Sequence, residues 1–144
     1  MSYSLDTNVL VYASDTESPR HRAARDFLAR CAAGPEVVIV PWPVAMSYLR
    51  IVTDPRILRH PLAPREAEAN LESLLGLPHV RVIGEEDGFW QVYRALTAGQ
   101  VVRGRLVPDA HLAALLVQHG VRRFYTSDVD FRRFREIEVL DPYG

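Results

Sequence analysis

Carboxylates stand at three separated places in this chain where a secondary-structure element is expected to begin or end. Asp6 follows a short strand-like run, Asp109 falls in the first turn of a helix-forming segment, and Asp128 follows a second strand-like run. Carboxylates gathered in one cleft repel one another, and a bound cation relieves that repulsion. Oxygen ligands select hard cations such as Mg²⁺ or Mn²⁺. The set predicts metal-assisted attack of water on a phosphodiester.

Each acidic residue also has a simpler interpretation. Asp6 is well suited to cap the helix that starts near Asn8, and Asp109 interacts favourably with a helix dipole. Asp128 and Asp130 are typical turn residues. These interpretations stay open, but they do not explain why all of these residues fall at the same predicted edge of a sheet.

The elements that would position these residues alternate between strand and helix. Strands are expected at 2–5, 36–40, 80–83, 124–126 and 138–140, and helices at 8–13, 19–33, 44–52, 66–75, 89–96 and 107–116. Parallel neighbours need crossover connections, so this alternation predicts an α/β fold with a parallel sheet covered by helices on both faces. A chain of 144 residues without linker or repeat is expected to be a single domain, 1–144.

Composition excludes some classes of function and sets the expected compartment. The 17 basic residues, all of them arginine, nearly balance 18 acidic ones, so there is no global positive field for polyanions. Any nucleic acid must therefore be gripped locally. Cys31 is the only cysteine and is expected in a helix core, which fits a reducing cytoplasm. Without a signal peptide or an apolar run that could span a bilayer, we expect a soluble cytoplasmic protein with no membrane partner.

Several other side chains could contact a nucleic acid. Arg50, Arg103 and Arg105 could hold phosphates, although exposed surface arginines are the more common case. His111 follows Asp109 by two residues, and residues two apart on a helix point to different faces, so we expect a packing or surface role.

Two tryptophans have competing interpretations. Trp42 and Trp90 could stack on unpaired bases. Their apolar neighbours Val44 and Phe89 instead favour a core position or a dimer contact.

Three ordered motifs resemble those of PIN-domain ribonucleases: Asp6–Leu10, Asp109–Ala114 and Thr126–Phe131. The likeness covers essentially the whole chain. It is closest to the VapC toxins of bacterial type II toxin–antitoxin pairs, in the branch whose middle segment resembles Tyr48–Thr53 followed by Pro55-Arg56.

The resemblance implies an α/β/α sandwich around a central, mostly parallel sheet of four to five strands. It also implies a magnesium-dependent endoribonuclease, with manganese as an alternative ion, that cleaves a tRNA, rRNA or mRNA and so blocks translation and growth. Such toxins are usually homodimers. A VapB-type antitoxin is expected to hold the enzyme inactive by laying a segment across the acidic cleft and offering an arginine to the carboxylates.

Carried over residue by residue, the resemblance assigns metal-binding and catalytic roles to Asp6, Asp109 and Asp128. Of the terminal pair, Asp128 is the preferred ligand, and Asp130 either ligates as well or lies just outside the ligand set. The polar positions near the site are Thr7, Asn8, Thr126 and Arg50.

One departure from the family pattern motivates an alternative function. Many PIN domains carry a glutamate on the helix after the second strand, and that position falls near Ser47, with no carboxylate between Pro43 and Thr53. The alternative is a catalytically weakened RNA-binding or regulatory module. A phosphatase-like hydrolase with Asp6 as nucleophile is disfavoured, because that chemistry needs an acid where Asn8 stands.

Overall fold

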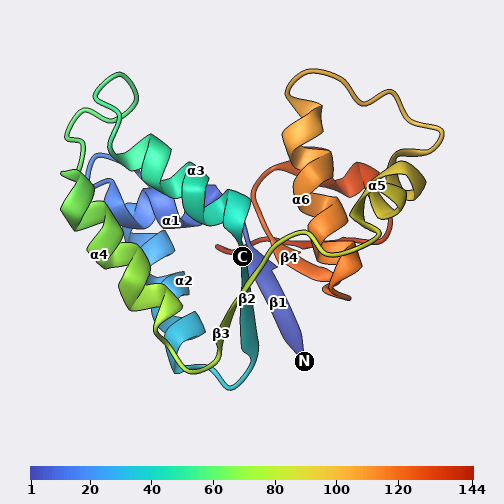
Figure 1. Cartoon of the computed structure of the whole chain (residues 1–144). Helices are drawn as coiled ribbons and strands as arrows, with labels where there is room; N and C mark the ends of the chain where they lie inside the picture. Colours follow the sequence, from blue (N-terminus) through green and yellow to red (C-terminus); the bar gives the residue numbers. More distant parts are fainter.

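A five-stranded, all-parallel sheet forms the centre of the molecule (Figure 1). The computed structural model describes residues 1–144. The strands are β1 (Ser2–Leu5), β2 (Val37–Pro41), β3 (Val80–Ile83), β4 (Arg123–Tyr125) and β5 (Glu138–Leu140), in the order β3-β2-β1-β4-β5. The predicted α/β class with four to five parallel strands is therefore confirmed.

The central strands are apolar because both of their faces are covered. In β2, Val38 and Val40 are fully buried, and Leu5 in β1 and Phe124 in β4 are equally inaccessible. The register pairs Tyr3 with Val38 on one side of β1. These contacts fix how far each strand end projects, and thus where the residues that follow it lie.

Six helices enclose the sheet. They are α1 (Thr7–Ser14), α2 (His21–Ala33), α3 (Trp42–Val52), α4 (Pro64–Leu75), α5 (Phe89–Thr97) and α6 (Leu106–Gln118). Figure 1 shows α1 to α4 grouped on one side of the strands and α5 with α6 on the other. This arrangement is the expected α/β/α sandwich. None of the helices combines the length and the apolar character that crossing a membrane requires.

The element boundaries differ from the predicted ones by a few residues. Helix α2 begins at His21 rather than at Pro19, because a turn in which the His21 N–H donates to the Ser18 carbonyl precedes it. Thr126 lies just beyond β4, and residues Val129–Arg133 form a short 3-10 helix, η1. Cys31 is buried in α2 as predicted.

The core interpretation of the two tryptophans is wrong. Trp42 is 48% exposed and Trp90 is 59% exposed. Helix α3 buries Val44 and Tyr48, whereas Trp42 stands at its first residue and is not among the residues that the helix buries. Helix α5 buries only Leu96, so Trp90 is left on its outer surface.

Candidate acidic active site

Asp6 occupies the single residue between β1 and α1. Its Oδ1 accepts a hydrogen bond of 2.7 Å from the Thr7 N–H, so the side chain does cap the helix. Its own N–H donates to the Tyr125 carbonyl at 2.9 Å, which joins the end of β1 to the end of β4. The capping and site interpretations are compatible, because an ionised carboxylate offers about four lone pairs and the cap uses one of them.

Thr126 links the two strand ends through its side chain. The hydroxyl is buried; it donates to Oδ2 of Asp6 at 2.6 Å and accepts from the Asp128 N–H at 3.0 Å. One hydroxyl therefore sets the position of Asp6 relative to the backbone of Asp128. The family resemblance predicted only that Thr126 is a polar residue near the site, and not that it links Asp6 to Asp128.

Asp128 begins η1 in the same way that Asp6 begins α1. Its Oδ1 accepts from the Asp130 N–H at 2.9 Å, which is the turn geometry that its residue type predicts. This bond fixes the Asp128 carboxylate over the backbone of the turn that carries Asp130.

Three carboxylates meet closely at the carboxyl edge of the sheet. One oxygen from each of Asp109, Asp128 and Asp130 lies within 4.8 Å of the other two. Oxygens bound to one Mg²⁺ at about 2.1 Å are separated by roughly 3 to 4 Å, so modest side-chain adjustment would let these three share an ion. Asp6 stands beside this trio rather than within it. Asp130, which sequence reasoning ranked last, is a full member.

Burial and the charges of the neighbouring aspartates shift the pKa values of Asp109 and Asp6. The pKa of Asp109 is raised to about 6, chiefly by burial and then by the charges of Asp128, Asp6 and Asp130, against a lowering by Arg105. Burial also raises the pKa of Asp6; Asp128 adds to the rise, and the hydrogen bonds from Thr126 and Thr7 oppose it. Uncompensated negative charge of this kind favours a divalent cation.

The remaining candidate residues are not all near the trio, since the charge of Arg50 acts on Asp54, just beyond the carboxyl end of α3. Asn8 is exposed at the start of α1, and Arg50, Arg103 and Arg105 are exposed. Among these arginines, Arg105 lowers the pKa of Asp109 through its charge, so it is close enough to the trio to act on it. Ser47 is half-buried on α3, a helix without any acidic residue.

His111 is engaged away from the acidic trio. Its Nε2 is hydrogen-bonded to a carboxylate oxygen of Glu85, and its ring packs edge-on against Phe89. This contact lowers the pKa of Glu85. The packing or surface role predicted for His111 agrees with these contacts.

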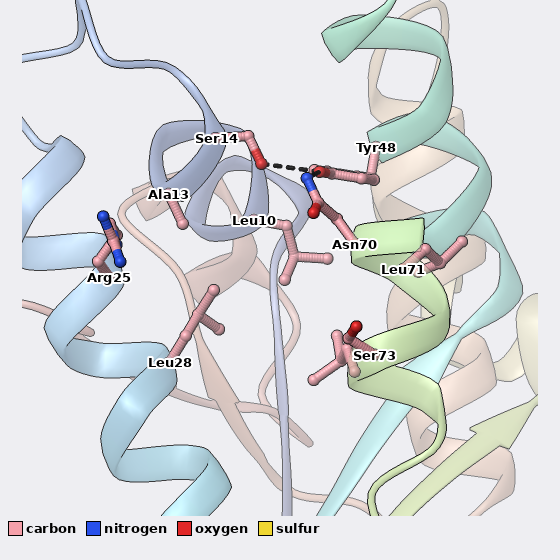
Figure 2. A pocket seen from close by; sticks show the side chains of 10 residues that line it. Leu10, Ala13, Ser14, Arg25, Leu28, Tyr48, Asn70, Leu71 and Ser73 are labelled. Atoms are coloured by element: carbon pink, nitrogen blue, oxygen red, sulfur yellow. Dashed lines mark hydrogen bonds between the residues drawn. The ribbon is translucent and has the colours of Figure 1, made fainter. Parts of the chain in front are cut away.

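A second hollow lies among α1, α2, α3 and α4 (Figure 2). Its volume is about 370 Å³, and it is lined mainly by apolar residues such as Leu10, Leu28 and Leu71. Tyr48 supplies a polar spot: its hydroxyl is 2.7 Å from the Ser14 hydroxyl and accepts from the Asn70 amide at 3.2 Å. No spacing in the sequence signals this pocket, because four helices contribute to it.

Comparisons with known proteins place this geometry in context. The PIN-domain family model matches residues 3–137. The chain is 47% identical to Ribonuclease VapC48 of Mycobacterium tuberculosis over 144 residues, which cover 100% of this chain and 99% of that protein. It is 33% identical to Ribonuclease VapC31 of the same organism over 140 residues, covering 97% of this chain and 98% of that protein.

Solved structures share the fold at low sequence identity. VapBC2 from Rickettsia felis, bound to a fragment of its promoter DNA, superposes with a TM-score of 0.69 at 16% identity over 98% of both chains. Mycobacterium tuberculosis VapC20, described as a Sarcin-Ricin loop cleaving toxin, gives a TM-score of 0.63 at 23% identity, covering 90% of this chain and 92% of that one.

Proposed function

The chain belongs to the PIN-domain family and, within it, to the VapC ribonucleases, and from that premise we propose that it is the toxin of a VapBC pair, a magnesium-dependent endoribonuclease. The observation that carries the proposal is the meeting of Asp109, Asp128 and Asp130 oxygens within 4.8 Å. Hydrolysis of a tRNA, rRNA or mRNA would block translation and so arrest growth. The acting unit is proposed to be one PIN domain over 1–144, in the cytoplasm.

The residues present fit a divalent cation. The donors are all carboxylate oxygens, which suit Mg²⁺ and Mn²⁺, and at least two of them sit where burial and mutual repulsion disfavour ionisation without a counter-ion. Asp109, Asp128 and Asp130 would hold the ion, with Asp6 completing the site from the side. When bound, the ion supplies a polarised water and charge stabilisation at the phosphoryl oxygens.

The chain's own groups supply positioning. Thr126 holds Asp6 and the Asp128 backbone in one arrangement, so the carboxylates need little reorganisation when substrate arrives. Thr7 and Asn8 at the start of α1, together with Arg50, Arg103 and Arg105, are the polar groups proposed to face RNA. Arg105 is the arginine whose charge already acts on Asp109.

A VapB-type antitoxin is the proposed protein partner. The apolar pocket in Figure 2 offers an anchor for its segment, and α1 joins that pocket to the acidic trio, since Leu10 and Ser14 line the pocket while Asp6 caps the same helix. Eight helical residues span about 12 Å. A segment lying along α1 could therefore fill the pocket and still extend a cationic side chain to the carboxylates. A homodimer is proposed for the toxin itself.

The test is cleavage of RNA by the purified chain with Mg²⁺ and with EDTA. Wild type should cut in Mg²⁺ only, and Asp6→Asn and Asp109→Asn should lose at least about a hundredfold in rate, because several kcal/mol of transition-state stabilisation depends on the ion. Glu68→Gln, an exposed carboxylate on α4, is the matched control. Full cleavage by both aspartate variants would refute the site.

The alternative, a catalytically weakened RNA-binding module, is favoured by one observation. Helix α3 carries no carboxylate, and Ser47 stands where the family resemblance expects one. Such a module would bind RNA equally well with chelator and with Mg²⁺ and would yield no products. The same experiment separates the two functions.

A further inference from the structure

A polar hollow of about 520 Å³ lies at the carboxyl end of η1. It is formed where the end of α5 and the following residues Gly99 and Gln100 meet Arg133, Arg135 and Glu136. The Gln100 amide donates to the Arg133 carbonyl at 3.3 Å, so the two sides of the hollow are tied together. Nothing in the proposed catalytic machinery uses this hollow.

The arginines of this segment have no acidic partner. Arg132, Arg133 and Arg135 are exposed, and none has a carboxylate oxygen within 4.0 Å. Most of the 17 arginines share this lack of a partner; only Arg123, 2.8 Å from Glu36, and Arg56, 3.3 Å from Asp54, have a carboxylate oxygen within 4.0 Å. Even Glu136, which lines the same hollow, does not neutralise them. The segment therefore presents free guanidinium groups.

These arginines are not counter-ions of the acidic trio either. The charge that chiefly opposes the raised pKa of Asp109 comes from Arg105, and not from any of these three arginines. Yet they belong to the same short segment, since η1 begins at the Asp128 cap and ends at Arg133. At about 2 Å per residue in a 3-10 helix, Arg133 lies on the order of 6 Å beyond Asp130.

A carboxylate site and free arginines on one short segment are complementary to a polyanionic chain. A phosphodiester at the acidic trio would need a metal ion between it and the carboxylates, whereas a neighbouring phosphate could bind guanidinium groups directly. Arginine suits this role because its planar fork donates two parallel hydrogen bonds to phosphate oxygens. The chain has almost no net charge, so such local contacts must supply most of its affinity for RNA.

We propose that Arg133 and Arg135, at the hollow that they form with Gln100, bind a phosphate of the RNA strand that flanks the scissile position. This inference rests on the proposed ribonuclease function and extends it by assigning a substrate-binding subsite. Arg132, on the same segment, adds positive charge beside it. The subsite contributes to binding and not to the chemical step, so its loss should raise KM and leave kcat unchanged.

The test is binding of a fluorescent 20-nucleotide single-stranded RNA to the full chain in EDTA, followed by anisotropy across a salt series. The Arg133→Ala/Arg135→Ala variant should bind about tenfold more weakly at 0.1 M salt. The slope of log K against log salt should fall by about 0.7, because each phosphate of a single strand that the protein neutralises contributes about 0.7. Arg22→Ala/Arg65→Ala, at exposed positions on α2 and α4, is the control and should change neither quantity.

Cleavage kinetics in Mg²⁺ complete the test. The Arg133→Ala/Arg135→Ala variant should show a raised KM and an unchanged kcat, and Arg133→Lys/Arg135→Lys should recover part of the loss. Wild-type binding by the alanine variant, or an equal loss in the control pair, would overturn the subsite. Failure of the wild type to cleave RNA would instead overturn the nuclease, while the EDTA binding data would still decide whether the arginines hold RNA.

Discussion

The two ends of β4 differ in whether their charged side chains are paired with opposite charges. At the amino end, Arg123 forms a forked pair with Glu36 at 2.8 to 2.9 Å, and its guanidinium also lies 5.5 Å from the centre of the Tyr3 ring. At the carboxyl end, Thr126 leads into Asp128 and Asp130, which meet Asp109, and no arginine or histidine nitrogen lies within 4.0 Å of these carboxylates. One strand thus carries a compensated pair and an uncompensated cluster.

The difference separates charges that support the fold from charges that support function. A half-buried ion pair costs little when both partners are present and is destabilising when one is removed. A cluster of like charges costs folding free energy as it stands, and it persists here in a site held by hydrogen bonds from Thr126 and Thr7. We therefore expect substitutions at the acidic end of β4 to lower cleavage activity. Substitutions at the Arg123 end should lower stability and leave cleavage activity unchanged.

The largest effect should come from removing the hydroxyl that organises the acidic end. Thr126→Val keeps the side-chain volume but loses the bonds to Asp6 and to the Asp128 N–H, so cleavage in Mg²⁺ should fall by roughly tenfold to a hundredfold, as other supporting residues of metal sites do. Thr126→Ser restores the hydroxyl and should retain most of the rate. Equal rates for the valine and serine variants would show that the hydroxyl does not position the carboxylates.

A substitution at the amino end of β4, where Arg123 pairs with Glu36, should change stability and not activity. Arg123→Ala leaves Glu36 half-buried and unpaired, and unfolding free energy should fall by about 2 kcal/mol, less than for a fully buried pair because both side chains retain some solvent contact. Denaturant titration measures this loss, and Arg123→Ala/Glu36→Gln should recover part of it. Cleavage at 25 °C should be unchanged. A reduced cleavage rate in a folded Arg123→Ala protein would contradict the claim that this end of β4 supports the fold and not the activity.

The smallest effect is a gain in stability when the acidic end is neutralised. Folding raises the pKa of Asp109 from 3.8 to about 6, so the folded chain holds a proton there more tightly than the unfolded chain does. Stability from this group is full below pH 4 and is lost as pH rises through about 6. In EDTA at pH 7.5, Asp109→Asn should melt about 2 °C higher than wild type, although Asp109 gains about 0.5 kcal/mol from the α6 dipole.

This stability gain should vanish in two circumstances. At pH 4 the wild-type carboxyl is protonated, and the two proteins should melt together. In excess Mg²⁺ only the wild type should gain stability, because an ion that binds the folded state alone stabilises it by mass action. Glu68→Gln should match wild type throughout, and a lower melting temperature for Asp109→Asn at pH 7.5 in EDTA would contradict the repulsion.

Sequence periodicity predicted the layers of the fold and placed Asp6, Asp109 and Asp128 at element boundaries. Such predictions succeed because strand and helix patterns are local, and parallel strands bring their carboxyl ends to one edge. The exact membership of the trio was not predictable, since it depends on the Asp130 N–H bond to Asp128 and on side-chain directions at the start of η1. Residue spacing alone left open whether these aspartates are caps and turn residues or metal ligands, and the resemblance to PIN-domain motifs favoured metal ligands.

Features that depend on tertiary packing were missed or misjudged. Arg123 and Glu36 are 87 residues apart, and only the pairing of β1 with β2 and β4 brings them together. Trp42 and Trp90 have apolar neighbours in sequence, yet about half or more of each side chain is exposed. The pocket with Tyr48 needs four helices, and no local pattern encodes their meeting.

The most direct test of the account is divalent-ion binding, measured by loss of the free Mn²⁺ electron paramagnetic resonance signal and by its recovery with Mg²⁺. We predict saturable binding by the wild type that weakens as pH falls through about 6, where protons compete at Asp109. Asp109→Asn and Asp128→Asn should lose that binding, and Glu68→Gln should keep it. Undiminished binding by both aspartate variants, or none by the wild type at millimolar Mn²⁺, would contradict the central claim.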